Sequence, residues 1–150
     1  MLEQRIEQDI KTALLGGDAK RVTTLRGLKA ALLNLKVATG KRDSGLSDDE
    51  VLNLLSKEAK KRQESADLYV QGGAQDRADH ELAEKRLIEE YLPAQLSEAE
   101  ITAAIEKVIA DGGASGPAAM GQVIGQVKGQ LGAAADGSII ARIAKEKLDQ

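Results

Sequence analysis

The sequence predicts an all-α fold made of two helical parts. Apolar residues recur at three- and four-residue steps, and no segment alternates apolar and polar residues with the period of a strand. The chain also has no Phe and no Trp, so its core must be built from Leu, Ile, Val, Ala and Met. Of these, Leu, Ala and Met favour helix. We therefore predict an N-terminal four-helix region followed by a C-terminal three-helix bundle.

A short junction around Pro93 divides the chain. Pro93 has no amide proton and disfavours helical geometry at the residue before it, so a helix should end there. Ser97 and Glu100 then have the spacing of a capping box, which starts the next helix. We expect an N-terminal helical domain at 1–93 and a C-terminal three-helix tail domain at 94–150.

Four helices are predicted in the N-terminal part, each bounded by turn or capping residues. The first ends at Gly16 and Gly17, the second runs from Asp18 to Gly40, the third from Ser47 to Gly72 and Gly73, and the fourth from about Asp76 to Tyr91. Asp18 can cap the second helix, and Ser47 with Glu50 repeats the capping-box spacing at the third.

The tail divides into three shorter helices. The first follows Ser97 and ends at Asp111, Gly112 and Gly113, the second is capped by Ser115 with Pro117 in its first turn, and the third follows a turn that contains Asp136. A bundle of this size is only marginally stable by itself.

Composition limits the classes of function. The formal net charge of −3 gives the whole chain no long-range attraction for nucleic acid or acidic membranes. The absence of Cys excludes disulfides and thiolate metal sites. The first residues alternate in charge, unlike a signal peptide, and no apolar run approaches the ~20 residues that cross a bilayer. We expect a soluble cytoplasmic protein that does not enter membranes.

No catalytic or cofactor-binding constellation is visible. His80 is the only histidine and lies among Asp79, Glu81 and Glu84, but a metal site would need further nitrogen or clustered oxygen ligands. We therefore expect His80 to lie on a solvated helix face and predict no metal site. The acidic residues at 48–50 are typical of a first helical turn and its dipole.

Basic residues gather on the second and third helices. Residues 20–42 include seven basic and no acidic side chains, and helical geometry places Arg26, Lys29 and Lys36 in one sector. A second cluster contains Lys57, Lys60, Lys61 and Arg62. Two interpretations stay open: a surface that contacts phosphates, or a solvated face neutralised by acidic residues of neighbouring helices.

Three glycines share one face of the second tail helix. Gly121, Gly125 and Gly129 are four residues apart, although each costs about 1 kcal/mol relative to Ala in a helix interior. Close packing of another helix is the commoner cause of this spacing, and we favour it. The alternative is close approach of a sugar-phosphate backbone or a partner protein. We add Gly121, Gly125 and the nearby Lys128 to the candidate nucleic-acid-binding residues.

Five segments together resemble one family. They are TLRGLKAA at 24–31, KRQES at 61–65, EYLPAQLS at 90–97, MG at 120–121 and ADG at 135–137. In this order they are similar to the YqeY family over nearly the whole chain. The resemblance implies an all-helical fold of two parts. The chain departs from the family at 129–134, where basic residues are usual and none is present, and at Gly73-Ala74, where Gly-Arg is usual.

The resemblance also implies a function. The family is similar to the C-terminal tail region of the B subunit of glutamine-dependent aminoacyl-tRNA amidotransferase, a carbon-nitrogen ligase in which that tail resembles a tRNA-binding module. We expect a tRNA-associated accessory protein without an active site of its own. The alternative is a protein-interaction module that docks on an amidotransferase or aminoacyl-tRNA synthetase subunit.

Overall fold

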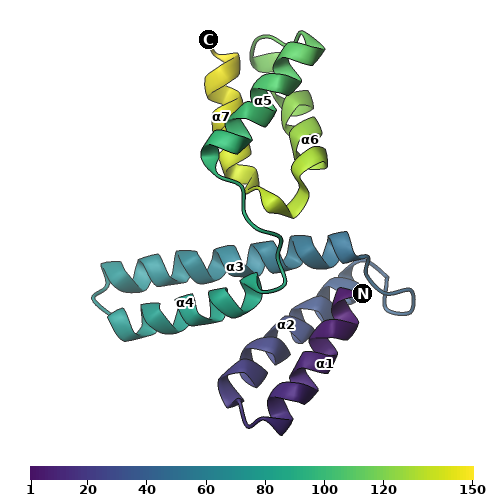
Figure 1. Cartoon of the computed structure of the whole chain (residues 1–150), viewed down its shortest axis with the longest axis vertical. Coiled ribbons are helices and arrows are strands. Elements are labelled where there is room, and N and C mark those ends of the chain that lie inside the picture. Colours follow the sequence, from purple (N-terminus) through teal and green to yellow (C-terminus); the bar gives the residue numbers. More distant parts are fainter. The chain divides into compact units, whose positions relative to one another are not determined.

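The computed structural model describes residues 1–150, and every regular element in it is a helix, which confirms the all-α prediction (Figure 1). Contacts divide the chain into two compact units, Met1–Leu92 and Pro93–Gln150. The first unit contains α1 (Leu2–Leu15), α2 (Ala19–Ala38), α3 (Asp48–Gln71) and α4 (Gln75–Glu89). The second contains α5 (Glu98–Gly112), the 3₁₀ turn η1 (Pro117–Ala119), α6 (Met120–Leu131), the 3₁₀ turn η2 (Gly132–Ala134) and α7 (Gly137–Leu148).

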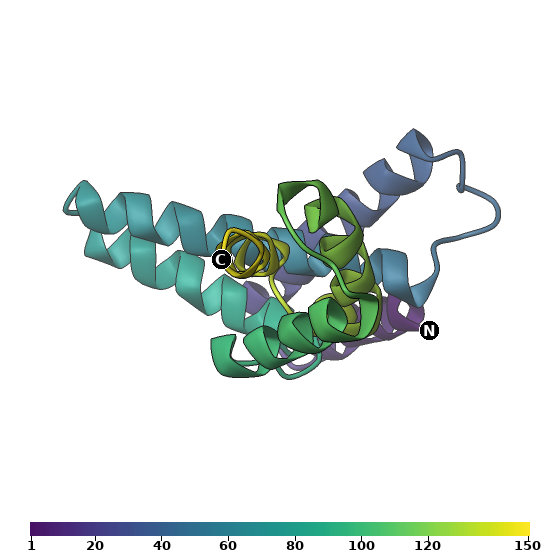
Figure 2. The ribbon, with the colours of Figure 1, turned by 90° about the horizontal axis from the view of Figure 1, so that it is seen from above.

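The first unit consists of two helical hairpins, α1 with α2 and α3 with α4. The longer hairpin, α3 with α4, lies side by side in both views (Figures 1 and 2). Gly17 and Gly73 allow the tight turns because their φ angles are 71° and 75°, a region that side chains disfavour. Both turns are where the sequence predicts them.

The predicted N-caps of the longer helices are confirmed. Asp18 accepts a hydrogen bond from the amide of Arg21 at 3.0 Å. Ser47 and Ser97 each form a complete capping box with the glutamate three residues later. These bonds satisfy amide groups that have no partner within the helix.

Aliphatic side chains from α1, α2 and α3 meet the end of α4 in the core of the first unit. The fully or nearly fully buried members are Ile6, Ile10, Leu25, Leu28, Leu32, Val51, Leu55, Ala59, Ile88 and Tyr91. Tyr91 is the one aromatic side chain among them, at 4% exposure. It lies beyond α4, which ends two residues earlier than the sequence predicts because the amide of Tyr91 bonds to the carbonyl of Ile88 in a tighter turn.

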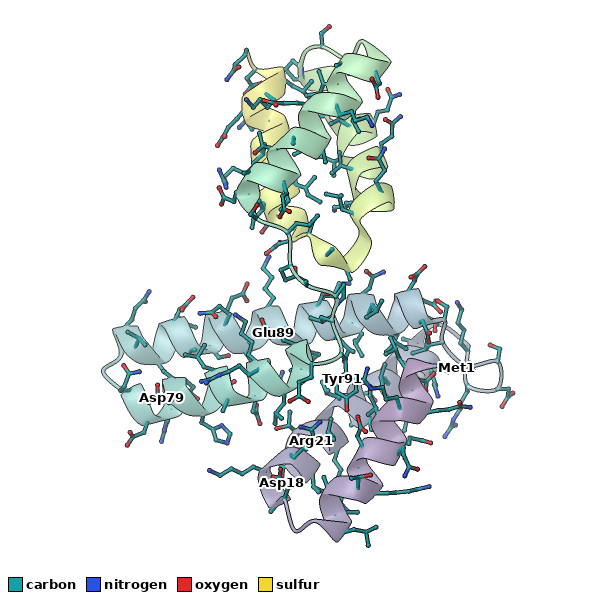
Figure 3. All side chains as sticks on the ribbon, viewed as in Figure 1. Met1, Asp18, Arg21, Asp79, Glu89 and Tyr91 are labelled. Atoms are coloured by element: carbon teal, nitrogen blue, oxygen red, sulfur yellow. The ribbon has the colours of Figure 1, made fainter.

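Tyr91 and the neighbouring Glu90 join the end of α4 to α1 and α2. The hydroxyl of Tyr91 donates a hydrogen bond to the carboxylate of Asp9 in α1. The guanidinium of Arg5 lies 4.8 Å from the centre of its ring. Arg21 of α2 lies beside Tyr91 (Figure 3) and pairs with Glu90 at 2.7 Å. Burial, and then the hydrogen bond to Asp9, raises the pKa of Tyr91 far above its usual value.

The second unit is a bundle of α5, α6 and α7 around its own core. The buried side chains are Ile101, Ile105, Val108, Val123, Val127, Ile140, Ile143, Ala144 and Leu148. As predicted, α5 stops at a left-handed glycine, Gly113, with φ 60°. Asp136 caps α7 by accepting from the amide of Ser138 at 2.8 Å.

The prediction that Ser115 caps the second tail helix is wrong. The next residue, Gly116, has φ 75°, and Pro117 begins the short turn η1 instead of an α-helix. The α-helix α6 starts only at Met120 and has no side-chain cap. Ser115 therefore lies too far from the first turn of α6 to cap this helix.

No helix of the chain combines the length and the apolar character that crossing a membrane requires.

Replacing Tyr91 by Phe should lower the free energy of unfolding by about 1–2 kcal/mol, because the substitution removes a hydrogen bond to a charged carboxylate and keeps the ring. Urea unfolding measures this. Tyr69→Phe is the matched control, since the hydroxyl of Tyr69 makes no hydrogen bond in the structure. An equal loss in both variants would contradict the role assigned to the Asp9 contact.

Glu100 should make folding sensitive to acid. Hydrogen bonds from the backbone amide and the hydroxyl of Ser97 lower the pKa of Glu100. A lowered carboxyl pKa contributes stability that is present at neutral pH and is lost as the pH falls through that pKa. The stability difference between wild type and Glu100→Gln should therefore shrink from pH 7 to about pH 3. Glu64→Gln is the control, because Glu64 is exposed and has no ion pair. If the difference in unfolding free energy between wild type and Glu100→Gln stayed constant with pH, the prediction would be contradicted.

Candidate nucleic-acid interface

The basic face of α2 is partly neutralised by α1. Lys29 pairs with Glu7 at 3.1 Å, and Lys36 pairs with Glu3. Arg26 is exposed and has no ion pair or hydrogen bond. The three cations border one surface hollow of about 440 Å³ between α1 and α2. The structure thus brings Arg26, Lys29 and Lys36 together as predicted, with two of the three already paired.

The second basic cluster belongs to the contact between α3 and α4. Glu58, a buried carboxylate at 9% exposure, accepts from Lys61 at 3.1 Å and from Arg62 at 2.6 Å. Arg62 also reaches Glu84 of α4 at 3.3 Å. Arg62 is therefore held inside a network that joins the hairpin, whereas Lys60 and most of Lys61 lie on the surface.

Three residues of the predicted basic clusters that are not among the candidate binding residues also have no ion pair. Lys20 of α2, Arg42 in the following loop and Lys57 of α3 are exposed. The sequence places these residues in basic stretches but does not show which of the basic residues form ion pairs. Pairing depends on which acidic residues neighbouring helices bring close.

The acidic first turn of α3 has a structural role, as predicted. Asp48 accepts a hydrogen bond from the amide of Leu2 at 3.0 Å. Glu50 completes the capping box with Ser47 and pairs with Lys41, and the hydrogen bond from Lys41 is the largest cause that lowers the pKa of Glu50. These carboxylates hold helix ends in place.

The glycine face of α6 is open. A methyl group added at Gly121, Gly125 or Gly129 would meet no heavy atom within 4 Å, so the interpretation that another helix packs on this face is wrong. The opposite face of α6 packs against the core of the second unit through Val123 and Val127. The glycines leave the helix backbone bare on the surface.

Lys128 lies beside the start of α7. A methyl group at Gly137 would stand 3.1 Å from Cε of Lys128 and 3.3 Å from its Nζ. The side chain therefore crosses from α6 to the first residue of α7, and no carboxylate pairs with it. It supplies positive charge in a unit where residues 97–150 contain five basic and seven acidic side chains.

An apolar feature of α2 escaped the sequence analysis. Leu33 and Val37 are 47% and 58% exposed, and they are four residues apart on one helix face. In the sequence they look like core residues, because they belong to the same apolar run as Leu32. Only the position of α1 shows that this side of α2 is uncovered.

Three curated relatives resemble the chain, each described as "Altered inheritance of mitochondria protein 41, mitochondrial". The protein of Eremothecium gossypii is 33% identical over 89 residues, which cover 59% of this chain and 48% of the relative. Those of Lachancea thermotolerans and Kluyveromyces lactis are 29% and 26% identical, over 71% and 81% of this chain and 57% and 66% of the relatives. The chain thus matches about half to two-thirds of the length of these relatives.

A protein-family model described as "Yqey-like protein" matches residues 3–148. This match includes both helical units and all five segments on which the sequence resemblance rests. The chain therefore belongs to the YqeY-like protein family.

Proposed function

We propose that this protein is a tRNA-associated accessory protein that binds RNA by its backbone and shape and has no active site of its own. The observation that carries the proposal is the open face of α6. Three glycines weaken the helix there by about 1 kcal/mol each, and no packing within the chain requires them. A bare helix backbone lets a sugar-phosphate chain approach more closely than a face covered by side chains.

The cations of α2 support the same proposal. Arg26 is unpaired and exposed, and Lys29 and Lys36 stand near it around one hollow. Double-stranded RNA is recognised largely through phosphates and 2′-hydroxyls. A basic helix next to a surface hollow suits that type of contact, and two tyrosines are too few for recognition by base stacking.

The resemblance to the amidotransferase B-subunit tail supports tRNA as the RNA that is bound. In that enzyme, ammonia production and transfer belong to other domains and subunits. This chain has no Cys to act as nucleophile and no phosphate-binding loop. We therefore assign it tRNA binding rather than ligation.

A second candidate function is docking on an amidotransferase or aminoacyl-tRNA synthetase subunit. The exposed Leu33 and Val37 favour it, since apolar side chains that share a helix face can anchor a partner protein. Affinity purification that returns a stoichiometric protein without RNA would support docking over RNA binding.

Replacing Gly125 by Ala should raise stability and weaken RNA binding at once. Ala favours helix, and the open space around Gly125 admits a methyl group, so the free energy of unfolding should rise by up to about 1 kcal/mol. The same methyl group would hold an RNA backbone away, so the affinity for bulk tRNA in a mobility-shift titration at low salt should fall.

Gly112→Ala is the matched control, because this glycine of α5 also has open space around it. It should not change tRNA affinity. Unchanged binding by Gly125→Ala, or no binding by the wild type at low salt, would contradict the proposal. Wild-type affinity should also fall steeply as salt rises, because phosphate contacts release counterions.

Replacing Glu7 by Gln should tighten tRNA binding, because it frees Lys29 and removes a negative charge beside Arg26. Glu106→Gln is the control: it changes the net charge equally and frees Lys147 of α7. A larger gain for Glu7→Gln in the same titration would indicate binding at α2. Equal gains in tRNA affinity for the two variants would show that the change in net charge alone causes them.

A further inference from the structure

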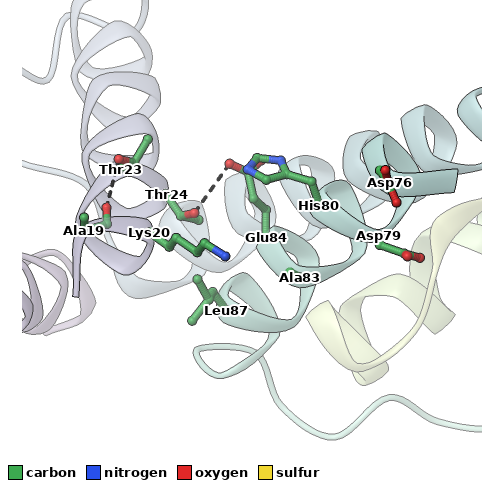
Figure 4. A pocket seen from close by; sticks show the side chains of 10 residues that line it. All are labelled: Ala19, Lys20, Thr23, Thr24, Asp76, Asp79, His80, Ala83, Glu84 and Leu87. Atoms are coloured by element: carbon green, nitrogen blue, oxygen red, sulfur yellow. Dashed lines mark hydrogen bonds between the residues drawn. The ribbon is translucent and has the colours of Figure 1, made fainter. Parts of the chain in front are cut away.

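A second hollow lies within the first unit, between α2 and α4, with a volume of about 520 Å³ (Figure 4). From α2 it is lined by Lys20, Thr23 and Thr24, and from α4 by side chains that include Asp76, His80 and Glu84. The last three are four residues apart, so they form one stripe along α4 that faces α2. The RNA-binding proposal does not use this hollow.

The charges around the hollow favour a cation. Asp76, Asp79 and Glu84 contribute three carboxylates, and Lys20 is the one basic side chain on the lining. Concave surfaces on which one sign of charge predominates attract the opposite ion. The single histidine of the chain stands among these carboxylates.

We propose that His80, Glu81 and Glu84 bind a divalent transition-metal cation of the Zn²⁺ type. One ring nitrogen of His80 and one carboxylate oxygen from each glutamate lie within 4.8 Å of one another. Zn²⁺ takes nitrogen and oxygen ligands at about 2.0–2.2 Å, so small rotations of these side chains close the site around one ion. Water completes the coordination, as in zinc sites with three protein ligands.

Glu84 is already oriented by its neighbours. Thr24, only 4% exposed, donates from its hydroxyl to Oε1 of Glu84 at 3.5 Å. Arg62 donates from Nε to Oε2 at 3.3 Å. Such outer contacts fix the position of a ligating carboxylate and leave lone pairs for the ion. Arg62 thereby acts as a positioning residue for this site.

The mixed donor set identifies the class of metal. Imidazole nitrogen suits Zn²⁺ and its transition-metal neighbours, whereas Mg²⁺ and Ca²⁺ prefer oxygen ligands alone. The sequence analysis rejected a metal site because His80 lacked clustered oxygen ligands. The structure supplies two of them on the same helix, at positions one and four residues after His80.

Equilibrium dialysis of the tag-free full-length chain against Zn²⁺, followed by elemental analysis, tests the proposal. We expect one Zn²⁺ per chain, and Mg²⁺ should not compete at equal concentration. NMR adds a direct readout, because the only imidazole of the chain should shift on addition of Zn²⁺. His80→Ala, Glu81→Gln and Glu84→Gln should each weaken binding about tenfold or more.

Asp76→Asn is the matched control, because it removes a carboxylate of the hollow that is not a proposed ligand. It should weaken binding much less than Glu84→Gln. His80 is exposed, so His80→Ala should stay folded, which circular dichroism verifies. No Zn²⁺ uptake by the folded wild type, uptake that His80→Ala leaves unchanged, or equal effects of Asp76→Asn and Glu84→Gln would each overturn the proposal.

Discussion

The partly buried hydrogen bond between Tyr91 and Asp9 is the constraint on which the first unit depends. A core of aliphatic side chains packs without direction, so it does not fix where one hairpin meets the other. The hydroxyl of Tyr91 has one acceptor, on α1, and the ring lies under Arg5. Beside it, the ion pair between Arg21 and Glu90 joins the end of α4 to α2. Directional contacts therefore set the arrangement that the apolar core then fills.

Local signals account for the parts of the fold that the sequence could predict. A capping box needs only a hydroxyl and a glutamate three residues apart, so the starts of α3 and α5 were readable at Ser47 and Ser97. The turns at Gly17 and Gly73 follow from the freedom of glycine at positive φ. The apolar periodicity predicted the helices themselves, because it is a property of residues that are close in the sequence.

Features that depend on contacts between helices could not be predicted. The apolar pattern of the sequence places Val123 and Val127 on the buried face of α6, but it does not show that no helix packs on the face of Gly121 and Gly125. For the candidate site, the sequence grouped the cations of α2 correctly. It could not show that Glu7, from another helix, pairs with Lys29. Nor could it show that Thr24, from a different helix, orients Glu84.

Ion pairing does not remove the cations of α2 from a role in binding. Lys29 and Glu7 are 57% and 53% exposed, and ion pairs in such positions contribute about 0–1 kcal/mol. An RNA phosphate can replace Glu7 as the partner of Lys29 at little cost. Arg62 differs, because it is 21% exposed and shared between Glu58 and Glu84, so its release would leave a buried carboxylate unpaired. Among the candidate residues, Arg26 and Lys29 are therefore available to an anionic partner, while Arg62 stays with the hairpin.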